Sequence, residues 1–345
     1  MPALHYDVCE EGGADSLQIA TNQCLCGDAL AALSDVAEAG IKAACVVTSP
    51  PYYGQRDYKN PGQIGLEENP EAYIDRLVEV FRLVWRVLDD NGTLWLNIGD
   101  CYAGGKGGRC DVDRIYTRPD GTTDRFTQKH DGVRIKRGNG NLKPKDLIGV
   151  PWRLAFALQA DGWYLRQDII WQKPNPMPEP VKDRPTRAHE YIFLLSKHRK
   201  YYYDNEAVKE PAVCSSLKKF TDNGKDKQRG HSRRHAGFNG RYAEKLAKEG
   251  VPQFKNLRDV WTFPPSQLSD AHFAVFPEQL AENCIKAGSR PGDLVLDPFM
   301  GSGTVAVVCE KLGRKWLGVE INSEYIEIQK NRLARIDPLL KQAGL

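Results

Sequence analysis

The sequence predicts an α/β fold with a doubly wound, largely parallel sheet. Strands alternate with amphipathic helices in both halves of the chain, an order typical of such sheets. Two short apolar strands end directly in Pro-rich or Gly-rich turns, as strands do at the ligand-binding edge of an open α/β sheet. With 345 residues, 41% of them hydrophobic and 27% charged, the chain can bury a core of one large unit with an inserted module.

The first predicted elements lie within residues 15–102. An apolar run predicts a buried strand at 45–48. Apolar residues recur at helical spacing over 71–88, which predicts a long amphipathic helix. The sequence Asp89-Asp90-Asn91-Gly92 is a turn signal that ends this helix, and residues 93–98 are predicted to form the next strand.

The remaining elements follow after polar intervals. Residues 147–196 predict a helix at 151–160 and strands at 164–171 and 191–195. Residues 272–336 predict a helix, a strand, a Gly-rich turn, a helix, a strand and a final helix, in that order.

Two polar segments between these elements are basic, although the net charge of the chain is only +3. Residues 197–258 hold 16 Lys and Arg against 7 Asp and Glu, and residues 103–146 hold 11 against 6. A charge run is often only a solvated face, so neither segment alone identifies a partner. We expect a mobile basic loop over 103–146 and an insert over 197–261 that divides a larger domain, 15–196 and 262–336.

The composition argues against a membrane protein and against a zinc site. No apolar run approaches the roughly 20 residues of a membrane span, and the N-terminal sequence lacks the basic and apolar regions of an export signal. The 9 cysteines are scattered, with Cys24 and Cys26 as the only close pair and no CxxC pair. We therefore expect free thiols in a reducing cytoplasm, no metal and no membrane association.

A Gly-rich turn near the C-terminus has the form of a ligand-binding loop. An apolar strand ends at Asp297 and is followed by Pro298-Phe299-Met300-Gly301-Ser302-Gly303-Thr304 and a helix. Glycines in such a turn let a ligand approach the backbone at the helix N-terminus. The next strand ends in Glu320, 17 residues past Gly303, near the spacing at which a carboxylate binds ribose hydroxyls. The GxGxxG pattern is not met, and a plain tight turn is the alternative.

A second loop, Thr48-Ser49-Pro50-Pro51-Tyr52-Tyr53, follows the strand at 45–48. Its prolines fix the backbone and remove donors, so that carbonyl groups point outward. The amine of a nucleic-acid base is a poor nucleophile, because its lone pair is delocalised into the ring. Ser49 Oγ and the Pro50 carbonyl can accept its hydrogens, and Tyr52 can stack on the base for about 1–3 kcal/mol. A Pro-stiffened loop around a buried tyrosine is the alternative.

The two loops resemble those of the amino-methyltransferases that act on DNA. DPFMGSGT at 297–304 is similar to the S-adenosylmethionine motif of that family, and SPPY at 49–52 is similar to its [S/D/N]PPY motif. Ser in the first place is typical of the cytosine-N4 group, whereas Asp or Asn is commoner in adenine-N6 enzymes. The resemblance implies S-adenosylmethionine as the cofactor and Ser49, Pro50, Pro51 and Tyr52 as the catalytic residues.

The resemblance also implies which residues hold the cofactor. Glu320 would bind the ribose, Phe299 and the loop backbone would hold the cofactor, and Phe276 lies where relatives hold its methionine end. Asp28 is a candidate for the adenine amine, with a helix cap as the alternative. The full implied set is Asp28, Phe276, Asp297, Phe299, Gly301, Ser302, Gly303, Thr304 and Glu320.

The catalytic loop precedes the cofactor loop, which is the order of the permuted β-type DNA methyltransferases. This likeness implies a circularly permuted, Rossmann-like methyltransferase fold whose insert is a target-recognition region. The implied partner is double-stranded DNA, from which the target base is flipped out. A homodimer, and a cognate restriction endonuclease of the same system that makes no direct contact, both stay open.

We therefore predict a site-specific DNA methyltransferase acting on cytosine N4. Adenine-N6 methylation by the same fold is the nearest alternative; a protein-glutamine or RNA methyltransferase and an inactive nucleic-acid-binding homologue are others. Cytosine-C5 methylation is disfavoured, because it needs a cysteine nucleophile and no Pro-Cys dipeptide is present. The neighbours Gly54, Arg56 and Asp57 could take part in catalysis or brace the loop. No residue of the sequence stands out as a strong base.

Overall fold

The computed structural model describes residues 19–55, 57–58, 60, 62–104, 114–117, 123–126, 141–212, 253–265 and 277–336. The chain forms two compact units: Met1–Tyr203 with Asp259–Leu345, and Asp204–Arg258. Phe276 and residues 213–252, with most of the basic side chains of the predicted insert, lie outside the described residues.

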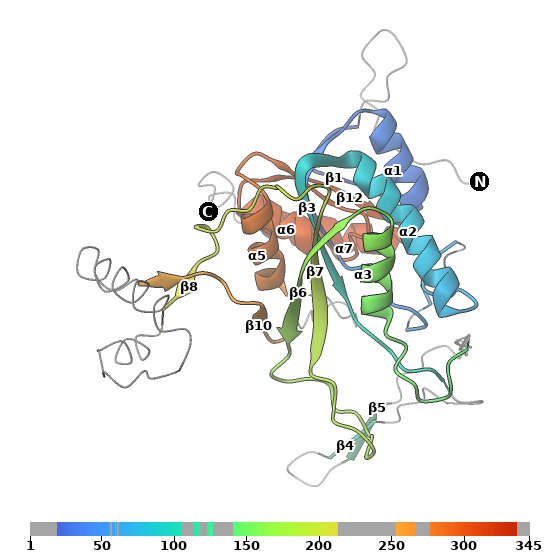
Figure 1. Ribbon diagram of the computed structural model, residues 1–345. Helices are drawn as coiled ribbons and strands as arrows, with labels where there is room; N and C mark the ends of the chain where they lie inside the picture. Colours follow the sequence, from blue (N-terminus) through green and yellow to red (C-terminus); the bar gives the residue numbers. More distant parts are fainter. Residues whose placement is uncertain are drawn as a thin grey trace, which may run out of the picture. The chain divides into compact units, whose positions relative to one another are not determined.

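The larger unit is built on an eight-stranded sheet (Figure 1). Its strands are β1 (Gln23–Cys26), β2 (Ala43–Thr48), β3 (Leu88–Ile98), β6 (Tyr164–Gln172), β7 (His189–Ser196), β10 (Val260–Thr262), β11 (Leu294–Asp297) and β12 (Lys315–Glu320). They lie in the order β1-β12-β11-β2-β3-β7-β6-β10. β7 is antiparallel to β3 and to β6, and the other neighbours are parallel. The predicted largely parallel sheet is confirmed.

Helices cover both faces of this sheet. The helices are α1 (Ala29–Glu38), α2 (Pro70–Val87), α3 (Val150–Ala160), α5 (Glu278–Gly288), α6 (Thr304–Lys311) and α7 (Ser323–Ala334). The first three pack in a row on one face and the last three on the other (Figure 1). Most of the apolar stripe that predicted α2 is buried, including Tyr73, Leu77, Phe81 and Val84, and Trp85 is partly buried.

The end of α2 differs from the sequence prediction. Asp89-Asp90-Asn91-Gly92 forms no separate turn, because β3 starts at Leu88, directly after the helix. A Cβ on Gly92 would lie 2.6 Å from Leu88 Cδ1 and 2.9 Å from the Ala44 carbonyl. The glycine therefore lets β3 approach β2 closely, where the pairing shifts register between Ala43 and Cys45.

The predicted loop over 103–146 contains regular structure. β4 (Arg114–Thr117) and β5 (Thr123–Phe126) form an antiparallel hairpin. The segments RIYT and TDRF contain β-branched and aromatic residues, which favour strands. The predicted basic loop therefore includes a β-hairpin, and its mobility stays a prediction.

The smaller unit includes a short antiparallel pair, β8 (Glu210–Pro211) with β9 (Phe254–Lys255). Ala212 N donates to the Gln253 carbonyl at 2.8 Å, which continues the pairing. This unit is narrower than the predicted insert of 197–261, since β10 belongs to the sheet of the larger unit.

Two compositional predictions bear on the described residues. The six cysteines among them are free thiols, as expected: Cys24, Cys26, Cys45, Cys101, Cys284 and Cys309. In this part of the chain, no helix combines the length and apolar character that crossing a bilayer requires.

Candidate active site

The two predicted loops meet where β11 and β2 lie side by side. The chain passes from β11 to β12 on one side and from β2 to β3 on the other, and ligands bind at such a switch point of an α/β sheet. The Thr48 hydroxyl donates to Asp297 Oδ1 at 2.6 Å and joins the two strand ends. A cavity of about 240 Å³ lies at this edge.

Most of the predicted site residues line this one cavity, although the sequence separates them by up to about 290 positions. Those at the cavity are Asp28, Ser49, Pro50, Pro51, Tyr52, Phe299, Gly301, Ser302, Thr304 and Glu320. Parallel strands bring their carboxyl ends to one edge, which places loops from both ends of the chain together.

Asp297 and Gly303 are not among the residues that line the cavity, and their predicted part in cofactor binding stays a prediction. Asp297 is 1% exposed, and its Oδ1 also accepts the Phe299 amide at 3.0 Å. Gly303 has a φ of 81°, and a Cβ there would lie 2.8 Å from Gln329 Cγ. Both residues therefore fix the conformation of the Gly-rich loop, whose other residues line the cavity.

Burial raises the pKa of Asp297 to about 7, while the Thr48 hydroxyl and the Phe299 amide oppose the shift and the nearby Glu320 carboxylate adds to it. An aspartate that has lost its hydration is costly to ionise, even with two hydrogen bonds. The link between the two loops is therefore sensitive to pH.

Glu320 is a buried acceptor at the end of β12. Its Oε2 accepts the Gly301 amide at 2.8 Å and its Oε1 accepts the Asn322 amide at 2.9 Å. Burial raises the pKa of Glu320, and these backbone bonds oppose the shift. Each carboxylate oxygen can accept a second hydrogen bond, so Glu320 retains acceptor capacity at the cavity.

Asp28 caps α1. Its Oδ1 accepts the amides of Leu30 and Ala31 at 3.0 and 3.1 Å, so the structure shows the helix cap that was the alternative to a cofactor contact. Asp28 also lines the cavity, and a carboxylate has enough lone pairs to cap the helix and accept from a ligand amine as well.

The SPPY loop is braced from behind. The Tyr73 hydroxyl donates to the Pro51 carbonyl at 2.7 Å, and the Gly54 amide donates to the Gly65 carbonyl at 2.7 Å. Gly54 has a positive φ of 60°, which favours glycine. The observed role of Gly54 is therefore to hold the SPPY loop in place. Arg56 lies outside the described residues.

The Tyr52 ring rests on the backbone of Gly99. A Cβ at Gly99 would lie 2.7 Å from Tyr52 Cε2 and 3.1 Å from Cδ2, so no larger residue fits beneath the ring. Tyr52 also lines the cavity. The ring is therefore held in place beside the space where a flat ligand can stack.

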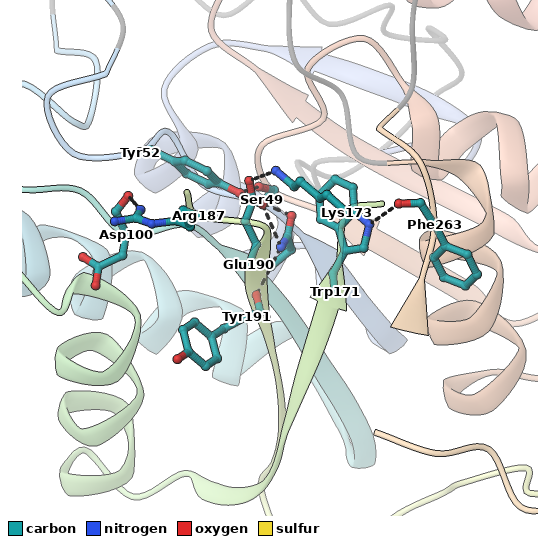
Figure 2. A network of polar contacts seen from close by, with 10 residues as sticks. Ser49, Tyr52, Asp100, Trp171, Lys173, Arg187, Glu190, Tyr191 and Phe263 are labelled. Carbon is teal, nitrogen blue, oxygen red and sulfur yellow. Dashed lines mark hydrogen bonds and ion pairs between the residues drawn. The ribbon is translucent and has the colours of Figure 1, made fainter. Parts of the chain in front are cut away.

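A polar network at the Tyr52 hydroxyl was not anticipated from the sequence (Figure 2). Tyr52 donates to Glu190 Oε2 at 2.7 Å, and Asn97 Nδ2 contacts the same oxygen at 3.3 Å. Lys173 forms an ion pair with Glu190 Oε1. Asn97, Lys173 and Glu190 all line the cavity.

The sequence marks these three residues only weakly, and it does not show that they lie together. Each is a polar residue within or beside an apolar strand segment, and Glu190 lies at the start of the run HEYIFLLS. Only strand pairing shows that they meet: Ile98 pairs with Tyr191 and Trp171 pairs with Glu190.

Trp171 closes this end of the cavity. The residue is buried, and its indole N–H donates to the Phe263 carbonyl at 3.0 Å. Lys173 Nζ lies over the ring, 4.4 Å from its centroid, a cation–π geometry. Because β12 lies on one side of β2 and β7 and β6 lie on the other, the cavity has an aromatic and charged end near Ser49, and a carboxylate and backbone end near Glu320.

Comparisons with known proteins identify the family to which this chain is similar. The sequence profile of a family described as DNA methylase matches residues 43–331. The chain is 51% identical over 291 residues to the type II methyltransferase M.SmaI of Serratia marcescens, a match that covers 84% of each chain. It is 46% identical over 307 residues to the type II methyltransferase M.Cfr9I of Citrobacter freundii, covering 89% of this chain and 86% of the relative.

Solved structures share the fold. One is the PvuII DNA methyltransferase, cytosine-N4-specific, with a TM-score of 0.55 and 19% identity, covering 92% of this chain and 89% of that one. Another is a putative DNA modification methylase of Thermus thermophilus in complex with S-adenosyl-L-methionine, with a TM-score of 0.51 and 24% identity, covering 91% of this chain and 93% of that one. At these identities the likeness concerns the fold alone.

Proposed function

This chain belongs to the DNA methylase family of N4 and N6 amino-methyltransferases, and from that premise we propose that it methylates the N4 amine of cytosine in double-stranded DNA. The observation that carries the choice of base is Ser49 at the head of the SPPY loop, beside Pro50 and Tyr52 at the cavity. Serine in this place is typical of the cytosine-N4 group.

The residues at the carboxylate end of the cavity fit S-adenosylmethionine. Glu320 lines the cavity at the end of β12 and would offer acceptors for the ribose hydroxyls. Phe299 and Tyr325 line the cavity and would supply aromatic rings for the adenine, and Gly301 would let the backbone approach the cofactor closely. When bound, this cofactor supplies a methyl group activated by a sulfonium.

The residues at the other end fit an amino group on a flat ring. The Pro51 carbonyl already accepts a hydrogen bond from the Tyr73 hydroxyl. The backbone carbonyl of Tyr52 accepts one from the Gln55 amide at 3.3 Å. Ser49 Oγ and the Pro50 carbonyl would then accept the two amine hydrogens, with the base flipped out of the duplex and stacked on Tyr52. Such positioning can supply roughly 7–11 kcal/mol of a reaction barrier.

We also propose that the basic insert reads the DNA sequence and that the 103–146 segment helps to clamp the duplex. The charge of residues 197–258, 16 basic against 7 acidic, suits phosphate contacts. DNA affinity should then fall steeply with salt, because phosphate neutralisation releases counterions. Salt-insensitive binding would contradict this part of the proposal.

The test is product identification. The protein is incubated with S-adenosylmethionine and unmethylated DNA of diverse sequence, and the digested nucleosides are identified by mass spectrometry. We expect N4-methylcytosine. N6-methyladenine would overturn the choice of base and keep the family, and no methylated nucleoside would overturn the DNA substrate. A rise of Tm with S-adenosylmethionine would separately report cofactor binding.

A further inference from the structure

Ser49, Tyr52 and Glu190 form a hydrogen-bonded chain that has a direction (Figure 2). Ser49 Oγ lies 3.4 Å from the Tyr52 hydroxyl, and the Tyr52 hydroxyl lies 2.7 Å from Glu190 Oε2. An ionised carboxylate only accepts hydrogen bonds. Tyr52 therefore gives its single proton to Glu190, and its oxygen can accept the proton of Ser49.

Two neighbours, Lys173 and Asn97, hold Glu190 at the end of this chain. Lys173 pairs with Oε1, and the two side chains are 21% and 14% exposed. Asn97 Nδ2 approaches Oε2 and also donates to the Tyr191 carbonyl at 3.1 Å. Lys173 is in turn held over the Trp171 ring. The carboxylate is thus fixed and its charge is balanced, so its orientation toward Tyr52 is set before a substrate arrives.

We propose that Glu190, acting through Tyr52, is a positioning residue that turns Ser49 into an acceptor for the substrate amine and draws off the proton that the amine loses. This inference rests on the proposed amino-methyltransferase function. A serine hydroxyl has one proton and two acceptor lone pairs. With the proton directed at Tyr52, the lone pairs are what Ser49 presents to an amine.

The proton balance follows from the same chain. Once the N–C bond to the methyl group has formed, the nitrogen carries a positive charge and must lose a proton. The N–H bond breaks and its electron pair stays on nitrogen, while the proton passes to Ser49 Oγ. Ser49 passes its own proton to the Tyr52 oxygen, and Tyr52 passes its proton to Glu190 Oε2. Glu190 then releases it to solvent.

Tyr52 is suited to pass a proton from Ser49 to Glu190. Its hydroxyl has a second acceptor, Asn97 Oδ1, at 3.3 Å, but Glu190 is closer. Burial, together with the Glu190 charge, raises the pKa of Tyr52 well above its usual value. The phenol therefore keeps its proton at neutral pH and serves as a donor to Glu190.

The experiment measures Glu190→Gln, Tyr52→Phe and the variant that carries both substitutions. Glu282→Gln serves as the control. Glu282 pairs with Lys286 on α5 and is 41% exposed, which makes it a matched control outside the site. Turnover is measured at saturating S-adenosylmethionine and DNA, and cofactor Kd by titration. We expect each single variant to lower kcat by about 100-fold, as loss of positioned proton transfer can, while cofactor Kd and the control stay at wild-type values.

The double variant tests whether the two residues act together. Residues of one network are not additive, so the double variant should be no slower than the slower single variant. Wild-type kcat in either single variant, or multiplied losses in the double, would overturn the inference. If Glu190→Gln fails to fold, Tyr52→Phe, which keeps the ring on Gly99, decides the outcome alone. Inactivity of the wild type and the control on DNA would instead mark a failure of the proposed function.

Discussion

Three carboxylates near the cavity have different environments and therefore different expected parts. Asp297 is fully enclosed and joins two loops, Glu320 binds two backbone amides while facing the cavity, and Glu190 is paired with Lys173. Residue type alone does not distinguish them, because burial and partners decide what a carboxylate can accept or release.

The first prediction concerns the raised pKa of Asp297. Between about pH 4 and 7 the folded carboxyl is protonated, whereas the unfolded one, with an ordinary pKa of 3.8, is ionised. The wild type therefore loses stability relative to Asp297→Asn as pH rises from about 4 to 7, by on the order of 1 kcal/mol per pH unit, and no further above pH 7. Urea unfolding from about pH 5 to 8 measures the difference, with the exposed Asp75→Asn as the surface baseline. A difference that stays constant with pH would contradict the raised pKa of the buried carboxyl.

The second prediction concerns the support of Tyr52. Gly99→Ala would place a Cβ against the ring, so the ring must shift, and turnover should fall by about 10- to 100-fold, as small misplacements near a reacting atom can cause. Gly104→Ala is the matched control, because nothing lies within 4 Å of a Cβ there. Equal kcat values for the two variants would show that the Tyr52 position does not matter.

The third prediction concerns Ser49. Ser49→Ala removes one acceptor from the proposed amine site while leaving the carboxylate end of the cavity unchanged. Loss of an interaction made to the reacting amine lowers kcat without weakening ground-state binding of the cofactor. We expect turnover to fall far more than S-adenosylmethionine affinity, measured by steady-state kinetics and by titration. A variant with wild-type turnover would remove Ser49 from the mechanism.

At the scale of elements, close packing of α5 against the sheet supports the strand that leads into the site. The last residue of α5, Gly288, faces β2 and β3. A Cβ there would lie 2.6 Å from both Cys45 Sγ and Thr93 Oγ1, and 2.9 Å from the indole nitrogen of Trp95. β2 carries the SPPY loop, so this packing fixes the strand from which the catalytic loop starts.

The fourth prediction follows from that contact. Gly288→Ala should lower the free energy of unfolding by about 1–3 kcal/mol, the usual cost of overpacking a core. Glu282→Ala, on the exposed side of the same helix, should change it by less than about 0.5 kcal/mol. Chemical denaturation measures both. A Gly288→Ala variant as stable as Glu282→Ala would show that the sheet can shift to accommodate the added methyl group.

At the scale of the whole molecule, the proposed recognition insert should be separable from the larger unit that carries the cavity. The β8–β9 pair brings the two ends of the segment 213–252 together, with Ala212 bonded to Gln253. A short Gly/Ser linker can therefore replace that segment without stretching the chain.

The fifth prediction is that such an excision variant unfolds cooperatively and binds S-adenosylmethionine with wild-type affinity but loses site-specific methylation. The cavity-lining residues within the described part of the chain lie outside the removed segment, whereas ten of the basic residues lie within it. Thermal unfolding with and without cofactor and a methylation assay on plasmid DNA measure the three properties. Retained specific methylation would place recognition elsewhere in the chain.

Much of this protein follows from local sequence. The burial pattern of α2, the strand before each loop and the two motif loops were all predicted, because periodicity and turn residues report directly on the local backbone. The resemblance of the two loops named the family that the comparisons then showed. Asn69, which caps α2 through the Ala72 amide, is another feature that depends only on neighbours in sequence.

The tertiary structure decided which residues share a site and what each one touches. Glu190 meets Tyr52 across 138 positions and Asp297 meets Thr48 across 249, separations at which the sequence carries no pairing information. Strand order and register determine these contacts, and they are set by the packing of the whole sheet. For the same reason Asp297 turned out to be a buried link between loops and not part of the cavity wall: burial is a property of the assembled core, whereas a motif reports only the residue type and its neighbours.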